Sequence, residues 1–291
     1  MGLLDLVKPI SNEARNKVTI FVGKPGSGKT TTAGTFPKPM LYVALDSDGG
    51  GEVLKCYSDD QIKVLTLKSD EPGTPGAKHL QAKVKDLLEE LKGPHPYKSV
   101  VFDAYTSIEE NLITYSEKVK GKKLNLDERG SIATAMLELR NRIVELSRGD
   151  VEYVCICHVK TKQCVDSTTG ETTEMLIPKM SYNNGNILLE RASAVIYSVR
   201  RTVVNEDGTR TVKFLNYVGA HPNMDTKLRT HGKMSTTGMY VEDLTYDKLQ
   251  SLMNGNTKIE QNLNVVETPT TPVDDENKEG EELLWIHKIT I

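Results

Sequence analysis

A glycine-rich segment near the N-terminus constrains the fold of this chain more than any other feature. Residues 23–30 read GKPGSGKT, which matches the pattern G-x-x-x-x-G-K-[S/T] at every fixed position. Glycines let the backbone wrap around a phosphate with its N–H groups turned inward. An apolar run precedes the segment at 18–22, and a helix-compatible run follows it at 31–33. This context predicts a phosphate-binding loop between a strand and a helix.

The positions of this loop have separate expected roles. The ammonium of Lys29 is expected to reach the β- and γ-phosphates of ATP, and the hydroxyl of Thr30 to ligate Mg²⁺. The helix that begins near Lys29 adds the positive end of its dipole. The residues expected to bind the nucleotide are Gly23, Lys24, Pro25, Gly26, Ser27, Gly28, Lys29, Thr30 and Thr31.

Strand-like and helix-like segments alternate along most of the chain. The expected strands are 18–22, 40–45, 63–67, 99–102 and 153–157, and apolar residues recur with helical period in 80–91, 108–115 and 132–146. Continuous apolar strands separated by helices predict an α/β fold, with a mostly parallel sheet covered by helices on both faces. The runs 194–199 and 211–215 flank a turn signal and predict an antiparallel hairpin added to this sheet. A last short helix is expected at 243–253.

The two ends of the chain differ from this core. We expect an N-terminal extension at 1–17, a core at 18–253 and a tail at 254–291. Seven acidic residues face one lysine between 267 and 282, which is typical of a disordered tail. The tail ends in the apolar sequence LLWI, at 283–286, which is either a loose terminus or a short motif for a protein partner.

The composition excludes several classes of protein. With 37 Lys and Arg against 40 Asp and Glu, the net charge of -3 argues against a nonspecific DNA coat. Aromatic residues make up only 5% of the chain, which disfavours a long base-stacking platform. No apolar run reaches the roughly 18 residues of a transmembrane helix, and the N-terminus does not read as a secretory signal. We therefore expect no membrane partner.

The cysteines do not indicate a disulfide framework or a metal centre. Cys155 and Cys157 belong to an apolar run typical of a buried strand, and although Cys164 and His158 lie near them, no C-x-x-C pair is present. This pattern argues against zinc and fits a reducing, cytosolic compartment.

Two polar residues directly follow predicted strands. Asp103 comes after the run 99–102 and is expected to hold Mg²⁺ together with Thr30. His158 follows the run 153–157, where a polar side chain can sense the γ-phosphate; a purely structural histidine is the alternative.

A pair of aspartates follows the strand expected at 40–45. Asp46 and Asp48 precede three consecutive glycines, which allow a sharp turn at the carboxyl edge of the sheet, where ligands bind in such folds. We expect Asp48 to orient the attacking water, with Asp46 as the second candidate and a helix cap or turn as the structural alternative.

Taken in order, these segments resemble the core of RecA-type recombinases. The chain is most similar to minimal, phage-encoded RecA-like proteins that act in single-strand annealing and recombination. The resemblance covers about 19–229 and is carried by GKPGSGKTT (23–31), ALDSDGG (44–50), VVFDAYTS (100–107), CICHVK (155–160) and NILLERASAVIYSVRR (186–201). It implies a DNA-stimulated ATPase in the cytoplasm of a bacterium or phage-infected cell, with Lys29, Asp48, Asp103 and His158 as its catalytic set.

The resemblance also implies contacts with single-stranded DNA and with further copies of the chain. Two segments, 118–129 and 160–186, fall where the family has its DNA loops, and such loops would contact mainly phosphates. The candidate DNA-binding residues are Lys120, Lys122, Lys123, Arg129, Lys160 and Lys162, and Lys227 and Arg229 are candidates to act in trans on a neighbour's nucleotide. The family's N-terminal polymerisation domain is missing, which leaves a homo-oligomer expected and filament formation open.

Other readings of the same residues remain open. A partition ATPase of the ParA/MinD type is one alternative, because Lys24 matches a second loop lysine, although Pro25 departs from that pattern. A nucleotide-gated DNA-binding or loader module with little turnover is another. A GTPase is disfavoured because no N-K-x-D motif is present, and a small-molecule kinase because no arginine-rich lid follows Lys160.

Overall fold

The computed structural model describes residues 16–45, 50–58, 60–165, 170, 172–204, 207–230 and 239–255. The helical elements are α1 (Lys29–Ala33), the 3₁₀ helix η2 (Gly50–Leu54), α2 (Leu80–Glu90), α3 (Ser107–Lys120), α4 (Leu126–Leu146), α5 (Tyr182–Arg191) and α6 (Tyr246–Met253). The strands are β1 (Val18–Val22), β2 (Met40–Leu45), β3 (Ile62–Leu67), β4 (Ser99–Asp103), β5 (Glu152–Cys157), β6 (Val159–Val165), β7 (Thr172–Pro178), β8 (Ala194–Val204), β9 (Arg210–Tyr217), β10 (Lys227–Leu228) and β11 (Tyr240–Glu242).

A single large sheet organises the described part of the chain. Its strand order is β11-β9-β8-β1-β5-β4-β2-β3, with β10 paired to β8. The strands from β8 to β3 along this order run parallel, whereas β9, β10 and β11 pair antiparallel. This topology confirms the predicted α/β fold with an antiparallel C-terminal extension.

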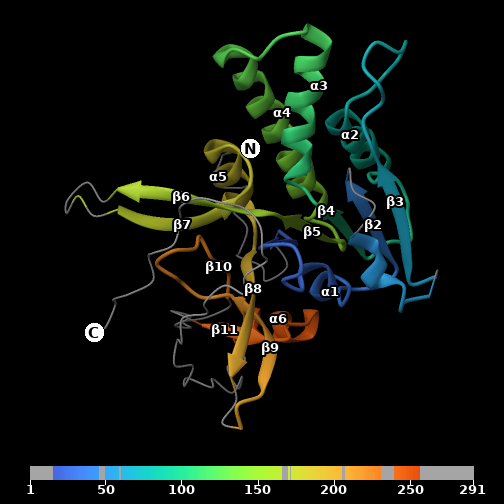
Figure 1. Ribbon diagram of the computed structural model, residues 1–291. Helices are drawn as coiled ribbons and strands as arrows, with labels where there is room; N and C mark the ends of the chain where they lie inside the picture. Colours follow the sequence, from blue (N-terminus) through green and yellow to red (C-terminus); the bar gives the residue numbers. More distant parts are fainter. Residues whose placement is uncertain are drawn as a thin grey trace, which may run out of the picture.

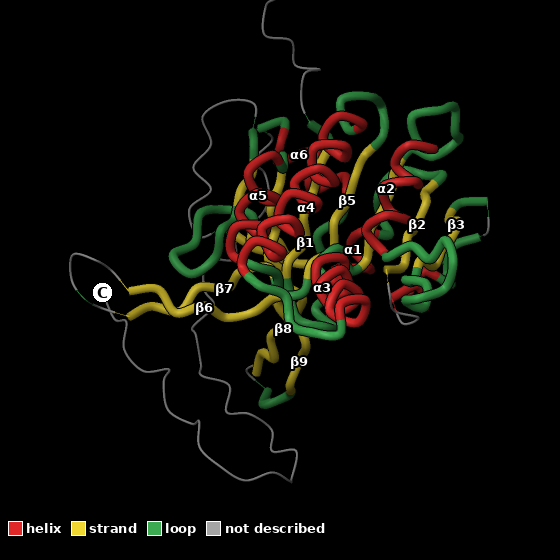
Figure 2. Tube along the Cα trace, turned by 90° about the horizontal axis from the view of Figure 1, so that it is seen from above, coloured by secondary structure: helices red, strands yellow, loops and turns green. Residues whose placement is uncertain are grey.

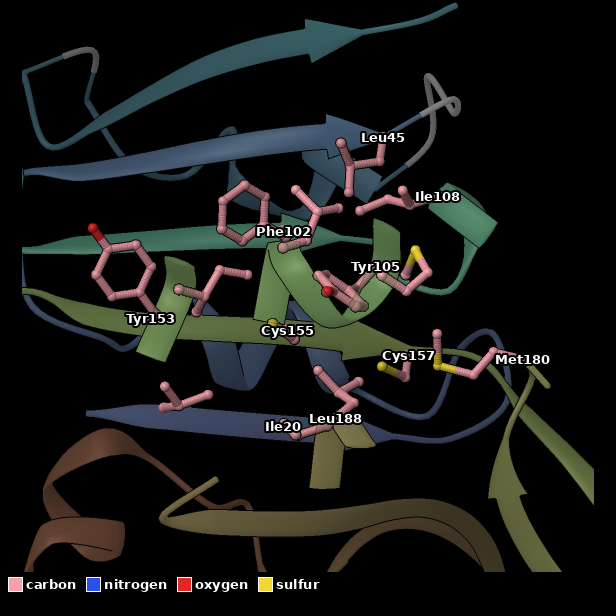
Figure 3. Packing of buried hydrophobic residues seen from close by; sticks show 14 of the residues in the cluster. Ile20, Leu45, Phe102, Tyr105, Ile108, Tyr153, Cys155, Cys157, Met180 and Leu188 are labelled. Atoms are coloured by element: carbon pink, nitrogen blue, oxygen red, sulfur yellow. The ribbon is translucent and has the colours of Figure 1, made fainter. Parts of the chain in front are cut away.

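Helices cover both faces of the sheet, as Figure 1 shows, with α2 to α5 above it and α1 and α6 below. Figure 2 gives the same arrangement from above, with the helices of the first group lying across the strands. Successive strand residues point to opposite faces, so Ile20 and Val22 join the core cluster under α2 to α5 while Phe21 joins the cluster over α1 and α6. Figure 3 shows part of the first cluster, in which Phe102, Tyr105 and Cys155 pack together.

Two hairpins extend beyond this layered body. Only Ala194–Tyr197 of β8 pair with β1, and the rest of β8 continues past the end of β1 alongside β9. Strands β6 and β7 form a separate two-stranded antiparallel sheet, which projects away from the main sheet in Figure 1. Both hairpins start at the carboxyl edge of the parallel strands, next to the predicted phosphate-binding loop.

The predicted core elements are confirmed, with bounds shifted by a few residues. The two segments expected as DNA loops are not loops. Residues 118–129 are the end of α3, a short turn and the first turn of α4, because Asn125 and Glu128 form a capping box that starts α4. Residues 160–186 contain the β6–β7 hairpin and the start of α5. The expected acidic tail and most of the N-terminal extension lie outside the described residues, and no described helix has the length and apolarity of a membrane span.

Candidate functional site

The loop between β1 and α1 has the backbone that a phosphate cradle requires. Gly26 and Gly28 adopt positive φ angles of 73° and 86°, which side-chain-bearing residues rarely adopt. A Cβ atom on Gly23 would lie 2.3 Å from the carbonyl oxygen of Ser198, so only glycine allows β8 to approach this closely. Gly28 is the N-cap of α1 and provides no side-chain cap, which leaves the N–H groups of the first turn for a ligand.

The side chain of Lys29 lies inside this loop and contacts its backbone. Lys29 is only 5% exposed, and its Nζ donates to the carbonyl oxygens of Gly23, at 2.9 Å, and Lys24, at 2.7 Å. Burial lowers the pKa of Lys29, and the nearby carboxylate of Asp103 opposes that shift. Two carbonyl oxygens of the loop therefore hold the ammonium in place.

Two hydroxyl groups from separate elements donate hydrogen bonds to one carboxylate oxygen of Asp103. Thr30 Oγ1 donates to Asp103 Oδ2 at 2.8 Å, and Tyr42 Oη donates to the same atom at 2.7 Å. Burial raises the pKa of Tyr42, and the charge of Asp103 raises it further, so the phenol remains a donor. A hydroxyl and a carboxylate held together are hard oxygen ligands of the kind that Mg²⁺ prefers. The residues present therefore fit the expected Mg²⁺ site.

The strand order explains where His158 lies. Because β5 lies between β1 and β4, His158 follows it at the sheet edge between the loop lysine and Asp103. Its backbone N–H donates to Thr106 Oγ1 at 3.2 Å, and its Nδ1 is buried without a hydrogen-bond partner among the described residues. Burial, together with the charge of Lys29, lowers the pKa of His158, so its imidazole is held in the neutral form.

Asp46 and Asp48 lie outside the described residues. The strand before them is placed, and Ala44 of β2 pairs with Asp103 of β4. The chain therefore leaves β2 directly beside the expected Mg²⁺ ligand.

A pocket of about 180 Å³ opens next to the start of α1. Its lining residues are Gly28, Thr31, Thr32, Thr35, Phe214, Asn216, Asp243, Leu244 and Thr245. The ring of Phe214, on β9, lies 3.2 Å from where a Cβ on Gly28 would be. The pocket thus adjoins the phosphate cradle on the side of α1.

Sequence reasoning missed Phe214 and Arg200, which form a cross-strand pair in the β8–β9 hairpin. Residues directly opposite on antiparallel strands share a face, and Ser198 pairs with Asn216 on that same face. An Nη atom of Arg200 lies 3.9 Å from where a Cβ on Gly26 would be. The predicted first strand of the hairpin stopped at residue 199, and extending it by one residue would have included Arg200.

The remaining candidate residues are dispersed. Lys120 forms an ion pair with Glu128, and Lys123 with Glu117 at 2.9 Å, at the turn between α3 and α4. Lys122 lies in the same turn, and Arg129 follows in α4.

The other cationic candidates lie on two further strands. Lys160 and Lys162 belong to β6 in the projecting hairpin. The ammonium of Lys227 donates to the carbonyl oxygen of Glu190 at 2.7 Å, so in this structure it caps α5. Arg229 lies next to it and is exposed.

Three comparisons with known proteins were made, and one of them identifies a family. No curated protein matches the sequence. Among solved structures, a prototypical ATPase from the type III secretion system of pathogenic bacteria is similar to 64% of this chain and 51% of its own length, with 13% identity and a TM-score of 0.40. The match thus spans about half of that protein. A family model described as "AAA domain" matches residues 15–230. Since this match covers well over half of the sequence and includes the whole phosphate-binding loop, the chain belongs to the AAA domain family of P-loop ATPases.

Proposed function

We propose that this protein is a Mg²⁺-dependent ATPase that acts on single-stranded DNA in phage-type recombination or annealing. The observation that carries the ATPase part is the hydrogen bond from Thr30 to Asp103, next to the anchored ammonium of Lys29. A P-loop threonine and a carboxylate from another parallel strand are the two protein ligands that hold Mg²⁺ in such ATPases.

Each residue of the site would have a separate role in binding Mg²⁺ and the phosphates. Thr30 and Asp103 would hold the metal, and Tyr42 fixes the carboxylate through Oδ2. Lys29 and the N–H groups of the loop would bind the phosphates. Bound Mg²⁺ would neutralise the charge that develops on the phosphate oxygens.

Asp48 is proposed to orient the attacking water, with Asp46 as the second candidate. The register of Ala44 with Asp103 supports this, because the aspartates follow β2 by only a few residues. Replacing Asp48 with Asn should leave nucleotide binding intact and slow turnover by about 10²–10⁴-fold. Wild-type turnover in this variant would assign the role to another residue.

His158 is proposed to connect the nucleotide to the projecting hairpin. It adjoins Val159, the first residue of β6, and its backbone also accepts a hydrogen bond from the N–H of Lys179, just after β7. A polar residue that changes contacts with the γ-phosphate would therefore move both strands of the hairpin. Lys160 and Lys162, on β6 of this hairpin, are proposed to contact DNA.

An ATPase assay with and without single-stranded DNA tests the proposal, together with size analysis under the same conditions. We expect turnover that DNA stimulates, accompanied by assembly of several copies. Lys29→Ala serves as the inactive control. Assembly into dimers with ATP alone would favour the partition ATPase, and DNA binding that depends on nucleotide without measurable turnover would favour the loader module.

A further inference from the structure

The residues that line the pocket beside the phosphate-binding loop indicate how the site would bind the base of a nucleotide. If a nucleotide lies with its phosphates over the P-loop, the pocket at Gly28 and Thr31 is where its base would lie, since it opens on the α1 side of the same loop. An inference about the base rests on the proposed nucleotide site. It concerns whether that site prefers one base over another.

The amide of Asn216 and the hydroxyls of Thr35 and Thr245 already form hydrogen bonds within the protein. Asn216 accepts a hydrogen bond from Ser198 Oγ at 2.8 Å through Oδ1, and its Nδ2 donates to the carbonyl oxygen of Val241. Asn216 is buried, at 2% exposure, so its amide cannot turn toward a ligand without breaking both bonds.

Thr35 and Thr245 are occupied in the same way. Thr35 Oγ1 donates to the carbonyl oxygen of Thr32 at 2.7 Å and accepts from the N–H of Tyr246 at 2.8 Å. Thr245 Oγ1 accepts from the N–H of Lys248, as the N-cap of α6. These groups build the wall of the pocket and have little capacity left for the edge of a base.

The other side chains that line the pocket within the described part of the chain do not distinguish adenine from guanine. Thr31 and Thr32 carry hydroxyls, which rotate to donate or accept and so suit either an amino group or a carbonyl oxygen at the purine 6-position. The carboxylate of Asp243 belongs to an exposed residue, where water competes for every hydrogen bond. The ring of Phe214 also lines the pocket, and every base has a face that can stack on a ring.

We infer that this site binds adenine and guanine nucleotides with similar affinity. The base stacks on the ring of Phe214, and the P-loop binds the phosphates. A pocket that recognises its ligand by packing separates close analogues by no more than about 10–200-fold, whereas a site built on buried hydrogen bonds separates them by about 10⁴–10⁵-fold. ADP and GDP should therefore bind the full-length protein with dissociation constants within about tenfold of each other.

Titration calorimetry with ADP and with GDP, each with Mg²⁺, tests this inference without relying on turnover. Phe214→Ala should weaken both nucleotides by about tenfold, since stacking of a base on an aromatic ring contributes on the order of 1–3 kcal/mol. Phe214→Tyr should retain both affinities. Val212→Ala is the matched control, because Val212 is an exposed side chain two residues earlier on β9.

The outcomes separate this inference from the proposed function. A preference of more than about tenfold for one nucleotide overturns base indifference and leaves the nucleotide site standing. Unchanged affinities in Phe214→Ala overturn the role of the ring. If the wild-type protein binds neither ADP nor GDP, the proposed ATPase function fails and this inference fails with it.

Discussion

The hydroxyl of Thr30 donates a 2.8 Å hydrogen bond to the carboxylate of Asp103, which joins two residues 73 positions apart in the sequence. Thr30 belongs to the helix after β1, and Asp103 ends β4, two strands away in the sheet. Parallel strands bring their carboxyl ends to one edge, so the fold itself brings these two side chains together.

Replacing Asp103 with Asn should reduce turnover by roughly 10²–10³-fold, because the variant loses the charge that is proposed to hold Mg²⁺. The amide oxygen can still accept the hydrogen bond from Thr30 or Tyr42, so the fold should persist. Nucleotide affinity measured with Mg²⁺ and with EDTA should become nearly equal in the variant. Thr30→Ser, which keeps the hydroxyl, is the control, and full turnover in Asp103→Asn would disprove the metal site.

Replacing Lys29 with Ala should abolish measurable turnover, because no other described cation is fixed inside the loop. The expected loss is at least about 10²-fold, as for removal of other groups that stabilise developing charge. Circular dichroism would confirm that the variant is folded. Lys17→Ala is a suitable control, since Lys17 precedes β1 at the opposite edge of the sheet and pairs with Asp150. Turnover that survives in Lys29→Ala would refute the nucleotide site.

The sequence predicted the central sheet because its strands are buried on both faces. All residues of β1, β2, β4 and β5 are buried, and continuous apolar runs of this kind are easily recognised. The loop and Asp103 were predicted for the same reason, since each directly follows such a run. Because the strands are parallel, the loop and Asp103 were also expected at the same edge of the sheet.

The projecting hairpin could not be predicted on this basis. In β6 no residue is buried, and its exposed and half-buried positions leave no core-facing stripe to detect. Helix α5 begins with YNNGN, whose asparagines and glycine disfavour helices. Its position depends on tertiary contacts, in which the buried carboxylate of Glu109 accepts from the N–H of Ser181 at 2.8 Å and from Asn184 Nδ2 at 2.9 Å. Contacts over more than 70 residues leave no local signal.

Arg200 should contribute to nucleotide affinity through its position beside Gly26. Its guanidinium can make charge-assisted hydrogen bonds to phosphate, so Arg200→Ala should weaken Mg-ATP binding by about tenfold, or 1.4 kcal/mol. Arg200→Lys should lie between the variant and the wild type, because lysine keeps the charge and loses the planar fork. Arg201→Ala, one residue on and facing the other way, should bind normally. Equal affinities in Arg200→Ala and the wild type would remove this residue from the site.

The lowered pKa of His158 predicts a pH dependence of stability. The folded protein favours the neutral imidazole, and the unfolded chain binds a proton near the ordinary pKa of 6.5. The stability contributed by neutral His158 is therefore complete above pH 6.5 and is lost as the pH falls below it. Thermal unfolding at about pH 7.5 and about pH 5.5 should show a larger decrease for the wild type than for His158→Gln. Equal decreases would mean that His158 titrates as it does in the unfolded chain.

Single-stranded DNA binding should depend unequally on the lysines of the α3–α4 turn. Lys123 is paired with Glu117, whereas Lys122 has no ion pair among the described residues. A lysine that must leave an acidic partner contributes less to phosphate binding, so Lys122→Ala should weaken binding more than Lys123→Ala. Removing one lysine that binds a phosphate of the single strand should flatten the plot of log affinity against log salt by about 0.7. Lys160→Ala tests the projecting hairpin in the same titration. If the slope is unchanged both in Lys122→Ala and in the combined Lys120, Lys122 and Lys123 variant, the α3–α4 turn does not bind DNA.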